Sequence, residues 1–237
     1  MPQSFLVKLR TTGNRIPFVS VLCDEASRLF PEYLDNERPV YALKHQGDSG
    51  GRIPLDQVET IAARYLADLR ASVPSDPVVL CGYSFGGIVA YEMAQQLTAS
   101  GARPPLLIII DSYVPSLHDE AMQHGRHFLG MLKDQLVGQI VENQLRRGKP
   151  LNGKLNHYHI IHTYSNAISA YKPKPYEGLL ALIRASDDWG PVDLGWYSLV
   201  RGRFLLKQIQ CNHAEMVKSH GRELAGVVRE LINETCS

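Results

Sequence analysis

Residues 82–87 read Gly-Tyr-Ser-Phe-Gly-Gly, a GxSxG pattern with Ser84 at its centre. A serine at such a position becomes a nucleophile when a strained strand-to-helix turn exposes its hydroxyl, and this turn has room only for small residues two positions to either side. The bare pattern is weak evidence, because glycine and serine are common. Here the strand-like run PVVLC directly precedes it and the helical run GIVAYEMAQQL directly follows it. This context predicts a nucleophile turn rather than a glycine-rich loop with an incidental serine.

A general base must accept the proton of the Ser84 hydroxyl, and a carboxylate must fix the tautomer of that base. His213 alone among the nine histidines lies just beyond a strand-like run near the C-terminus, with a helical pattern from about Val217 behind it. We therefore expect His213 to be the base. The other histidines lie in loops, in the lid described below or in the terminal helix, and His118 to His127 match no metal-binding spacing, so we expect no metal.

The acid has two candidate positions. Asp111 ends the run LLIII, one strand after the nucleophile, whereas Asp187 and Asp188 follow LLALIRA, one strand later. An aspartate at a strand end can also simply cap a turn. The spacing by itself therefore leaves Asp111 and Asp187 or Asp188 about equally favoured.

The elements that must position these residues follow an alternating pattern. Short apolar, β-branched runs bounded by Pro or Gly predict buried strands, and they lie at 17–22, 39–43, 77–81, 105–110, 179–184 and 203–211. Apolar residues at helical spacing predict helices over 55–69 and 88–97, with Gly101 as a stop signal. This alternation predicts an α/β fold with a mostly parallel central sheet flanked by helices.

The alternation breaks at about 115–171, which carries helical patterns without a convincing strand. We expect a helical lid inserted over the carboxyl edge of the sheet, because loops at that edge normally carry the site. The alternative is a pair of ordinary crossover helices. With or without a lid, 1–237 is expected to be a single domain, a size that buries a substantial core.

Composition excludes several classes of function. The chain has 25 Lys and Arg against 24 Asp and Glu, which argues against a general nucleic-acid or membrane-surface binder. Its four cysteines form no CxxC pair, and no apolar stretch resembles a secretory signal or a membrane span. These features favour a cytoplasmic protein.

The stretches GYSFGGIVAYEMAQQL, LLIIIDSYVPSL and CNHAEMV resemble type I thioesterase domains, which end non-ribosomal peptide synthetases and modular polyketide synthases and have the α/β-hydrolase fold. The likeness runs over nearly the whole chain. In that family the acid stands in an "IDS" context like 110–112, so the resemblance implies Ser84, Asp111 and His213 as the catalytic triad.

The same resemblance implies a substrate and a partner. In the family, a lid-covered channel receives an acyl or peptidyl chain from the phosphopantetheine arm of a carrier protein. The chain passes to the serine and is then released to water or to a nucleophile of its own, by hydrolysis or macrocyclisation. No cofactor bound by the domain itself is implied. Basic residues in the lid are candidates for contacting an acidic carrier, with a solvated face as the alternative: Arg146, Arg147, Lys149 and Lys154.

One departure from the family concerns the oxyanion hole. The backbone N–H of Phe85, directly after the nucleophile, is the first expected donor. The loop after the first predicted strand commonly contains glycine in the family and supplies the second donor, but 22–27 contain none, and we expect Cys23 to serve. Asp24 and Glu25 are expected to point outward and cap the next helix.

Two other functions stay open at this level. The first is a stand-alone editing thioesterase or an esterase, which would share the same motif. The family pattern begins almost at the first residue of the chain, which favours instead a domain cut from a larger synthase. The second is a catalytically silent module that uses the pocket of the fold to hold a ligand. The three triad positions argue for the enzyme.

Overall fold

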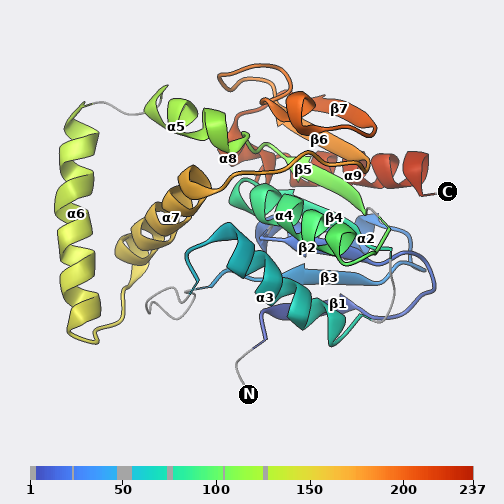
Figure 1. Ribbon diagram of the computed structural model, residues 1–237, viewed down its shortest axis with the longest axis horizontal. Coiled ribbons are helices and arrows are strands. Elements are labelled where there is room, and N and C mark those ends of the chain that lie inside the picture. The colour runs from blue at the N-terminus through green and yellow to red at the C-terminus, as the bar shows by residue number, and fades with distance from the viewer. Residues whose placement is uncertain are drawn as a thin grey trace.

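The computed structural model describes residues 4–22, 24–46, 55–73, 77–103, 105–124 and 128–236 (Figure 1). Within these residues a seven-stranded sheet has the order β1-β3-β2-β4-β5-β6-β7. Its strands are β1 (Leu6–Arg10), β2 (Phe18–Val21), β3 (Val40–Leu43), β4 (Val79–Tyr83), β5 (Leu106–Ile110), β6 (Leu180–Ala185) and β7 (Phe204–Ile209).

Helices connect these strands. They are α1 (Asp24–Ser27), α2 (Phe30–Tyr33), α3 (Val58–Arg70), α4 (Phe85–Ala99), α5 (Pro115–His124), α6 (Phe128–Arg146), α7 (Gly153–Ala170), the 3₁₀ helix η1 (Trp196–Leu199), α8 (His213–Met216) and α9 (Gly221–Thr235). In the part of the chain that the structure describes, none of them combines the length and the apolar character needed to cross a membrane.

The sheet is parallel from β3 to β7, which confirms the predicted α/β architecture. β1 pairs antiparallel with β3 at the edge of the sheet. The sequence does not predict β1, because charged residues interrupt its short apolar pattern. It also places the start of the terminal helix too early: α9 begins at Gly221, and the residues just after His213 form the separate short helix α8.

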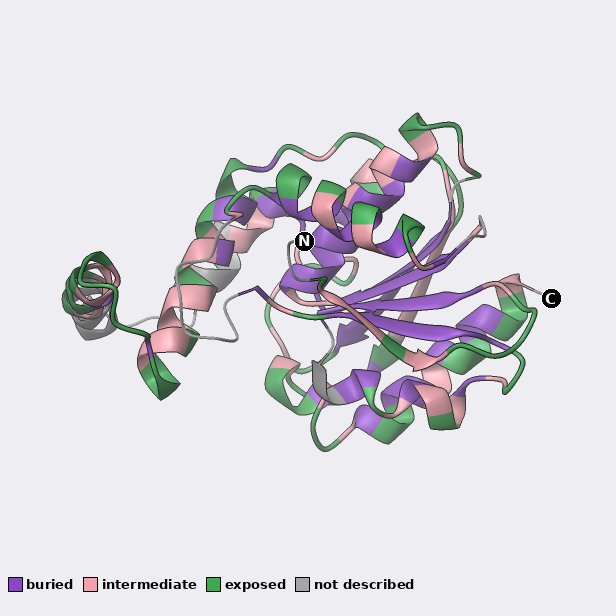
Figure 2. Cartoon of the chain, turned by 90° about the horizontal axis from the view of Figure 1, so that it is seen from below, coloured by how far each residue is buried: buried purple, intermediate pink, exposed green. Residues whose placement is uncertain are grey.

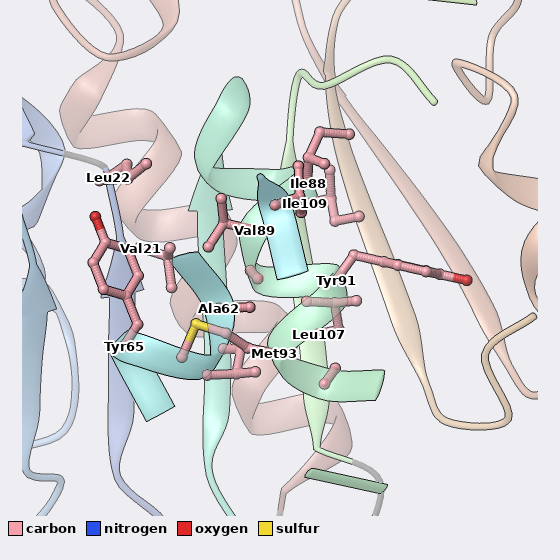
Figure 3. Packing of buried hydrophobic residues seen from close by; sticks show 14 of the residues in the cluster. Val21, Leu22, Ala62, Tyr65, Ile88, Val89, Tyr91, Met93, Leu107 and Ile109 are labelled. Atoms are coloured by element: carbon pink, nitrogen blue, oxygen red, sulfur yellow. The ribbon is translucent and has the colours of Figure 1, made fainter. Parts of the chain in front are cut away.

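Two hydrophobic layers enclose the sheet, because successive residues of each buried strand point to opposite faces. On one face Leu107 and Ile109 pack with residues of α3 and α4 (Figure 3). On the other face Ile108 and Ile110 pack with residues of α2 and α9. The strands are accordingly buried between helices on both sides, while the outer sides of those helices are exposed (Figure 2). This sandwich makes the sheet a rigid support for the loops at its edges.

Residues 115–170 form α5, α6 and α7 between β5 and β6, and thus supply the helices expected there. α7 packs against α4 and α5. α6 stands at one end of the molecule, away from the sheet, in both views (Figures 1 and 2). Leu136 and Ile140 of α6 have 63% and 50% of their surface exposed. The insertion is therefore tied to the core through α7.

Trp196 connects the loop after β5 to the segment that follows β6. Its side chain is fully buried, and its Nε1 donates a hydrogen bond of 2.6 Å to the carbonyl oxygen of Ser112. Gly195, with φ 85°, permits this approach, since a Cβ there would lie 2.5 Å from Val114 Cγ2. Trp196 thus fixes the backbone directly after Asp111.

We expect Trp196→Ala to lower the free energy of unfolding by about 3–5 kcal/mol, because it empties a fully buried site. Trp196→Phe should cost about 1–3 kcal/mol, since it leaves the buried Ser112 carbonyl without its donor. The matched control is Tyr197→Ala, whose 69% exposed side chain predicts a change within about 0.5 kcal/mol. Urea unfolding measures all three; equal effects at positions 196 and 197 would contradict this account.

Candidate active site

Four polar residues gather at the carboxyl edge of the sheet. Ser84 follows β4, Asp111 follows β5, Asp188 lies three residues after β6 and His213 lies four residues after β7. Because these strands are neighbours and parallel, their carboxyl ends meet at the same edge. Ser84 N donates a hydrogen bond of 3.0 Å to the carbonyl oxygen of Ile110, the residue before Asp111. The backbones of the candidate nucleophile and acid are therefore side by side.

Ser84 occupies a strained turn between β4 and α4. Its φ of 53° and ψ of −123° are rare for a residue with a side chain. The surrounding glycines have no space for a methyl group: a Cβ at Gly82 would lie 2.1 Å from the Gly86 carbonyl oxygen, and one at Gly86 would lie 2.1 Å from the Val21 carbonyl oxygen. This is the steric reason for small residues on both sides of the candidate nucleophile.

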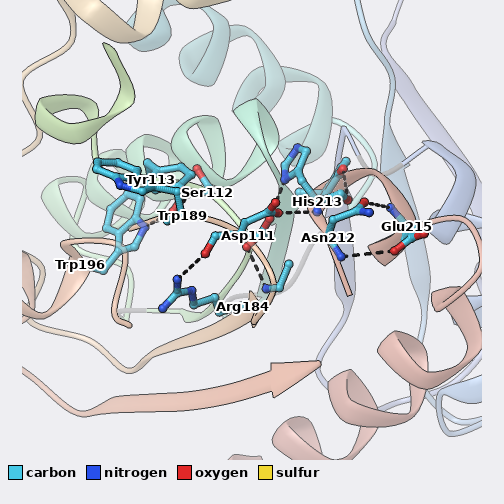
Figure 4. Close-up of polar contacts among 12 residues, drawn as sticks. Asp111, Ser112, Tyr113, Arg184, Trp189, Trp196, Asn212, His213 and Glu215 are labelled. Atoms are coloured by element: carbon cyan, nitrogen blue, oxygen red, sulfur yellow. Dashed lines mark hydrogen bonds and ion pairs between the residues drawn. The ribbon is translucent and has the colours of Figure 1, made fainter. Parts of the chain in front are cut away.

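Asp111 is a buried carboxylate with partners for both oxygens. Only 2% of the residue is exposed. Its Oδ1 accepts a hydrogen bond of 2.9 Å from Ala185 N, and its Oδ2 lies 2.6 Å from His213 Nδ1 (Figure 4). Asp111 itself has a φ of 43°, so the backbone just after β5 is strained, as it is at Ser84 just after β4. The arrangement holds one carboxylate oxygen towards the imidazole.

His213 is held by its ring and by its main chain. The ring of Tyr83 stacks on the imidazole, with centroids 4.7 Å apart, and the Tyr83 hydroxyl donates a hydrogen bond of 2.8 Å to the His213 carbonyl oxygen. The side chain stays 41% exposed. Tyr83 directly precedes Ser84, so this stack places the imidazole next to the turn that carries the candidate nucleophile.

The two aspartates after β6 contact His213 differently from Asp111. Asp188 Oδ2 accepts a hydrogen bond from the backbone N–H of His213. Asp187 is exposed, and its Oδ1 accepts a hydrogen bond of 3.2 Å from the Ser186 hydroxyl. The hydrogen bond to the His213 ring thus goes to Asp111, at the earlier of the two positions that the sequence leaves open.

Burial is the first cause that raises the pKa of Asp188, and the negative charge of Asp111 raises it further. The backbone N–H and the ring of His213 act in the opposite direction. Burial, together with the charges of Asp111 and Asp188, also raises the pKa of Tyr113 to about 12. The Tyr113 hydroxyl therefore stays protonated at neutral pH, as its hydrogen bond to the Trp189 carbonyl oxygen requires.

Of the two proposed oxyanion donors, the structure describes Phe85. Phe85 is the first residue of α4, where a backbone N–H has no acceptor within the helix. Its ring stacks on Tyr164 of α7, with centroids 4.0 Å apart. Cys23 lies outside the described residues. Its neighbour Leu22 has a φ of 54°, so the loop after β2 also leaves its strand in a strained conformation.

One group of described residues brings together atoms of the types that bind metals. A carboxylate oxygen or ring nitrogen of each of Asp111, Asp188 and His213 lies within 4.8 Å of the others. Both oxygens of Asp111 already accept hydrogen bonds, and Asp188 Oδ2 accepts one as well. These hydrogen bonds account for the arrangement of the three groups.

The sequence does not predict the contacts of Tyr83 and Asp188 with His213. The hydrogen bond of Tyr83 joins residues 130 positions apart in the chain, and that of Asp188 joins residues 25 positions apart. Tyr83 stands within the serine motif as an unspecified residue, and Asp188 enters the sequence analysis only as a candidate acid. Both contacts depend on how the strand ends meet in space.

A parallel sheet of this order, with a strained serine turn and an Asp–His pair at its carboxyl edge, defines an α/β-hydrolase. The sequence profile of the thioesterase domain matches residues 28–233, and the chain belongs to this family. It is an enzyme of the thioesterase class, as the sequence resemblance predicts.

Relatives of known function are large synthetases. The chain is 27% identical over 240 residues to malpibaldin synthetase of Mortierella alpina, covering 94% of this chain and 4% of the synthetase. It is 26% identical over 196 residues to vanchrobactin synthetase VabF of Vibrio anguillarum, covering 79% of this chain and 7% of the synthetase. The chain therefore spans a small part of the length of these relatives.

Solved thioesterases share the fold. A covalent complex of the NocB thioesterase domain with a fluorophosphonate nocardicin G analogue has a TM-score of 0.70 at 20% identity, covering 97% of this chain and 100% of that chain. The type II thioesterase BorB from the borrelidin cluster has a TM-score of 0.68 at 20% identity, covering 98% of each chain. Both kinds of thioesterase thus have this architecture.

We expect Gly86→Ala to lower the free energy of unfolding by at least about 2 kcal/mol, because its methyl group would overlap the Val21 backbone. The matched control is Gly226→Ala in α9, where a Cβ meets nothing within 4 Å. That variant should be stabilised by up to about 1 kcal/mol, the helix-propensity difference. Thermal unfolding monitored by circular dichroism compares the two; a neutral Gly86→Ala would contradict the packing described for the turn.

Proposed function

We propose that this chain is a serine thioesterase that releases an acyl, peptidyl or polyketide chain from a carrier-protein phosphopantetheine thioester through an acyl-enzyme on Ser84. The observation that carries the proposal is the 2.6 Å hydrogen bond between Asp111 Oδ2 and His213 Nδ1. The stack of His213 on Tyr83, the residue before Ser84, supports it further. Ser84 acts as nucleophile, His213 as general base and Asp111 as the acid that orients the base.

The two ring nitrogens of His213 have different partners, and this decides which nitrogen transfers the proton. When Nδ1–H donates to Asp111, the lone pair of the neutral imidazole is on Nε2. Nε2 takes the Ser84 proton as Oγ forms a bond to the thioester carbonyl carbon. The carbon–sulfur bond then breaks and His213 returns the proton to the leaving thiolate. In the second half, His213 takes a proton from the acceptor as it attacks the acyl carbon; the bond from that carbon to Ser84 Oγ then breaks, and His213 returns the proton to Oγ.

The oxyanion of both tetrahedral intermediates needs hydrogen-bond donors. The Phe85 N–H, at the start of α4, is the first donor, and the positive end of the helix favours a negative charge there. Cys23 N–H is proposed as the second. Each well-placed donor contributes about 3–4 kcal/mol to lowering the barrier.

The insertion at 115–170 acts as a lid in this proposal. Tyr164 of α7 stacks on Phe85, so this helix borders the position of the acyl group. Exclusion of water by such a cover decides whether the acyl-enzyme is hydrolysed or captured by a nucleophile of its own chain. Product analysis separates these two outcomes.

A carrier protein is the proposed partner, and the matches to multidomain synthetases support this choice. Four basic residues on and after α6 are all exposed: Arg146, Arg147, Lys149 and Lys154. Arg146 forms an exposed ion pair with Glu142 at 3.2 Å. This short basic segment is the proposed contact for an acidic carrier.

Ser84→Ala should abolish the acyl adduct that wild type forms with acyl-N-acetylcysteamine thioesters, since the nucleophile is removed. Asp111→Asn should slow acylation by about 10⁴-fold, because the amide favours the wrong tautomer of the base. Asp187→Asn changes an exposed carboxylate that accepts its hydrogen bond from Ser186, and should acylate at the wild-type rate. Intact-protein mass spectrometry measures the adduct, and chromatography of the products distinguishes hydrolysis from cyclisation.

Two outcomes of that experiment would overturn the proposal. An adduct that survives Ser84→Ala would move the nucleophile elsewhere. Wild type that forms no adduct with the small thioesters, with carrier-bound substrate or with a serine-directed fluorophosphonate would favour the silent binding module. Fast turnover of small free thioesters, without preference for the carrier, would favour the editing enzyme or esterase.

Reversing the charge of Arg147, Lys149 and Lys154 to Glu should raise KM for carrier-bound substrate about tenfold and leave acyl-N-acetylcysteamine turnover unchanged. Rim charges steer association, so the effect should shrink as ionic strength rises. Steady-state kinetics at two salt concentrations measure both substrates. Unchanged KM for the carrier-bound substrate would remove this surface as the contact.

A further inference from the structure

Asp188 is a carboxylate at the active site that the mechanism above leaves without a role. It follows β6, the strand between those that carry Asp111 and His213. Its Oδ2 accepts a hydrogen bond from the backbone N–H of His213, while Asp111 binds the ring of the same histidine. The two carboxylates, which follow the neighbouring strands β5 and β6, thus hold the same histidine, Asp111 by its ring and Asp188 by its main chain.

The backbone N–H of His213 needs an acceptor from outside its helix. His213 is the first residue of α8, and the first N–H groups of a helix have no carbonyl partner within it. Asn212 and Glu215 form a capping box, with hydrogen bonds of 3.1 Å to Glu215 N and 3.4 Å to Asn212 N. Asp188 supplies the acceptor for the N–H between them, and so completes the cap.

Asp188 is itself anchored from the sheet. Arg184 of β6 is 6% exposed, and its Nη2 donates hydrogen bonds of 2.9 Å to the carbonyl oxygens of Asp188 and Gly190. Gly190, with φ 110°, lies so close to Tyr113 that a Cβ would be 2.8 Å from its ring. The loop after β6 therefore has a fixed path, and the Asp188 carboxylate is presented to His213 by a rigid support.

The Asp188 charge costs stability. Because burial raises its pKa, the folded protein binds more protons at this site than the unfolded chain does. The free energy of unfolding accordingly falls as the pH rises from the ordinary range of an aspartate through the raised pKa. The placement of this half-buried carboxylate beside Asp111 is thus better explained by function than by stability.

We propose that Asp188 is a positioning residue for His213, which fixes the backbone of the base and adds a second negative charge beside its ring. The inference rests on the proposed function of Ser84 and His213. When His213 takes the Ser84 proton, the ring becomes a cation, and a carboxylate within 4.8 Å stabilises that state. Asp188 touches neither the substrate nor the transferred proton.

Three variants separate the two contributions. Asp188→Ala removes the acceptor and the charge, and should lower kcat about 10- to 100-fold through misplacement of the base. Asp188→Asn keeps an oxygen acceptor but removes the charge. It should lower kcat about fivefold, which is the effect of losing one unit charge about 4 Å from the ring in water-like surroundings. Asp187→Ala removes the neighbouring exposed carboxylate and should have no effect. KM should stay within about twofold of wild type throughout, since binding is not altered.

Stability and the split between kcat and KM distinguish positioning from a merely structural role. Asp188→Asn should unfold at the wild-type temperature or above it at neutral pH, while its kcat is reduced and its KM is unchanged.

Hydrogen exchange of the His213 backbone N–H, measured by NMR in the Ser84→Ala background, tests the inference without turnover. Adding Asp188→Ala should speed this exchange, because it removes the acceptor of the N–H, and adding Asp187→Ala should not. Equal exchange for the two, or equal kcat for Asp188→Ala and Asp187→Ala, would overturn the role of Asp188. Loss of activity only in parallel with loss of folded protein would overturn it as well. A wild type that forms no Ser84 adduct would instead overturn the proposed function, and the exchange measurement would still decide the role of Asp188.

Discussion

The parallel pairing of β4, β5, β6 and β7 is the constraint on which the whole site depends. Each strand runs in the same direction and in continuous register with its neighbour, so the four carboxyl ends form one edge. Residues as far apart in the chain as Tyr83 and His213 become hydrogen-bond partners at this edge. A slip of one residue in any of these strands would turn the buried side chains to the wrong face and displace the polar residue at its end.

The loops at this edge of the sheet are closely packed, and several of their residues have a strained backbone. Ser84 has a positive φ because the chain must reverse from β4 into α4 while Gly82 and Gly86 contact backbone directly. Leu22 and Asp111, at the ends of the two strands that flank β4, also have positive φ values. Each such residue costs on the order of 1–3 kcal/mol, and the strain persists only because the surrounding structure fixes it. Here the sheet, buried on both faces, supplies that support.

The insertion is linked to this rigid edge less closely than the strands are. α7 is fixed to the serine turn by the stack of Tyr164 on Phe85, whereas α6 exposes apolar side chains at a distance from the sheet. The core carries the candidate catalytic residues, and the insertion makes fewer contacts with it. The sequences of the two parts can therefore change independently. The fold shared with NocB and BorB at 20% identity is consistent with a core that tolerates wide changes in sequence.

Local apolar spacing, glycines and short motifs are enough to predict the strand–helix alternation, the serine turn, the helical insertion and the thioesterase resemblance. They leave the acid open between Asp111 and the aspartates after β6, and they do not predict β1, whose charged residues interrupt the apolar pattern. That the ring of His213 contacts Asp111 while Asp188 holds its backbone N–H is visible only in the folded chain. Local patterns fix where a strand ends, whereas contacts between the ends of different strands depend on register and twist across the sheet.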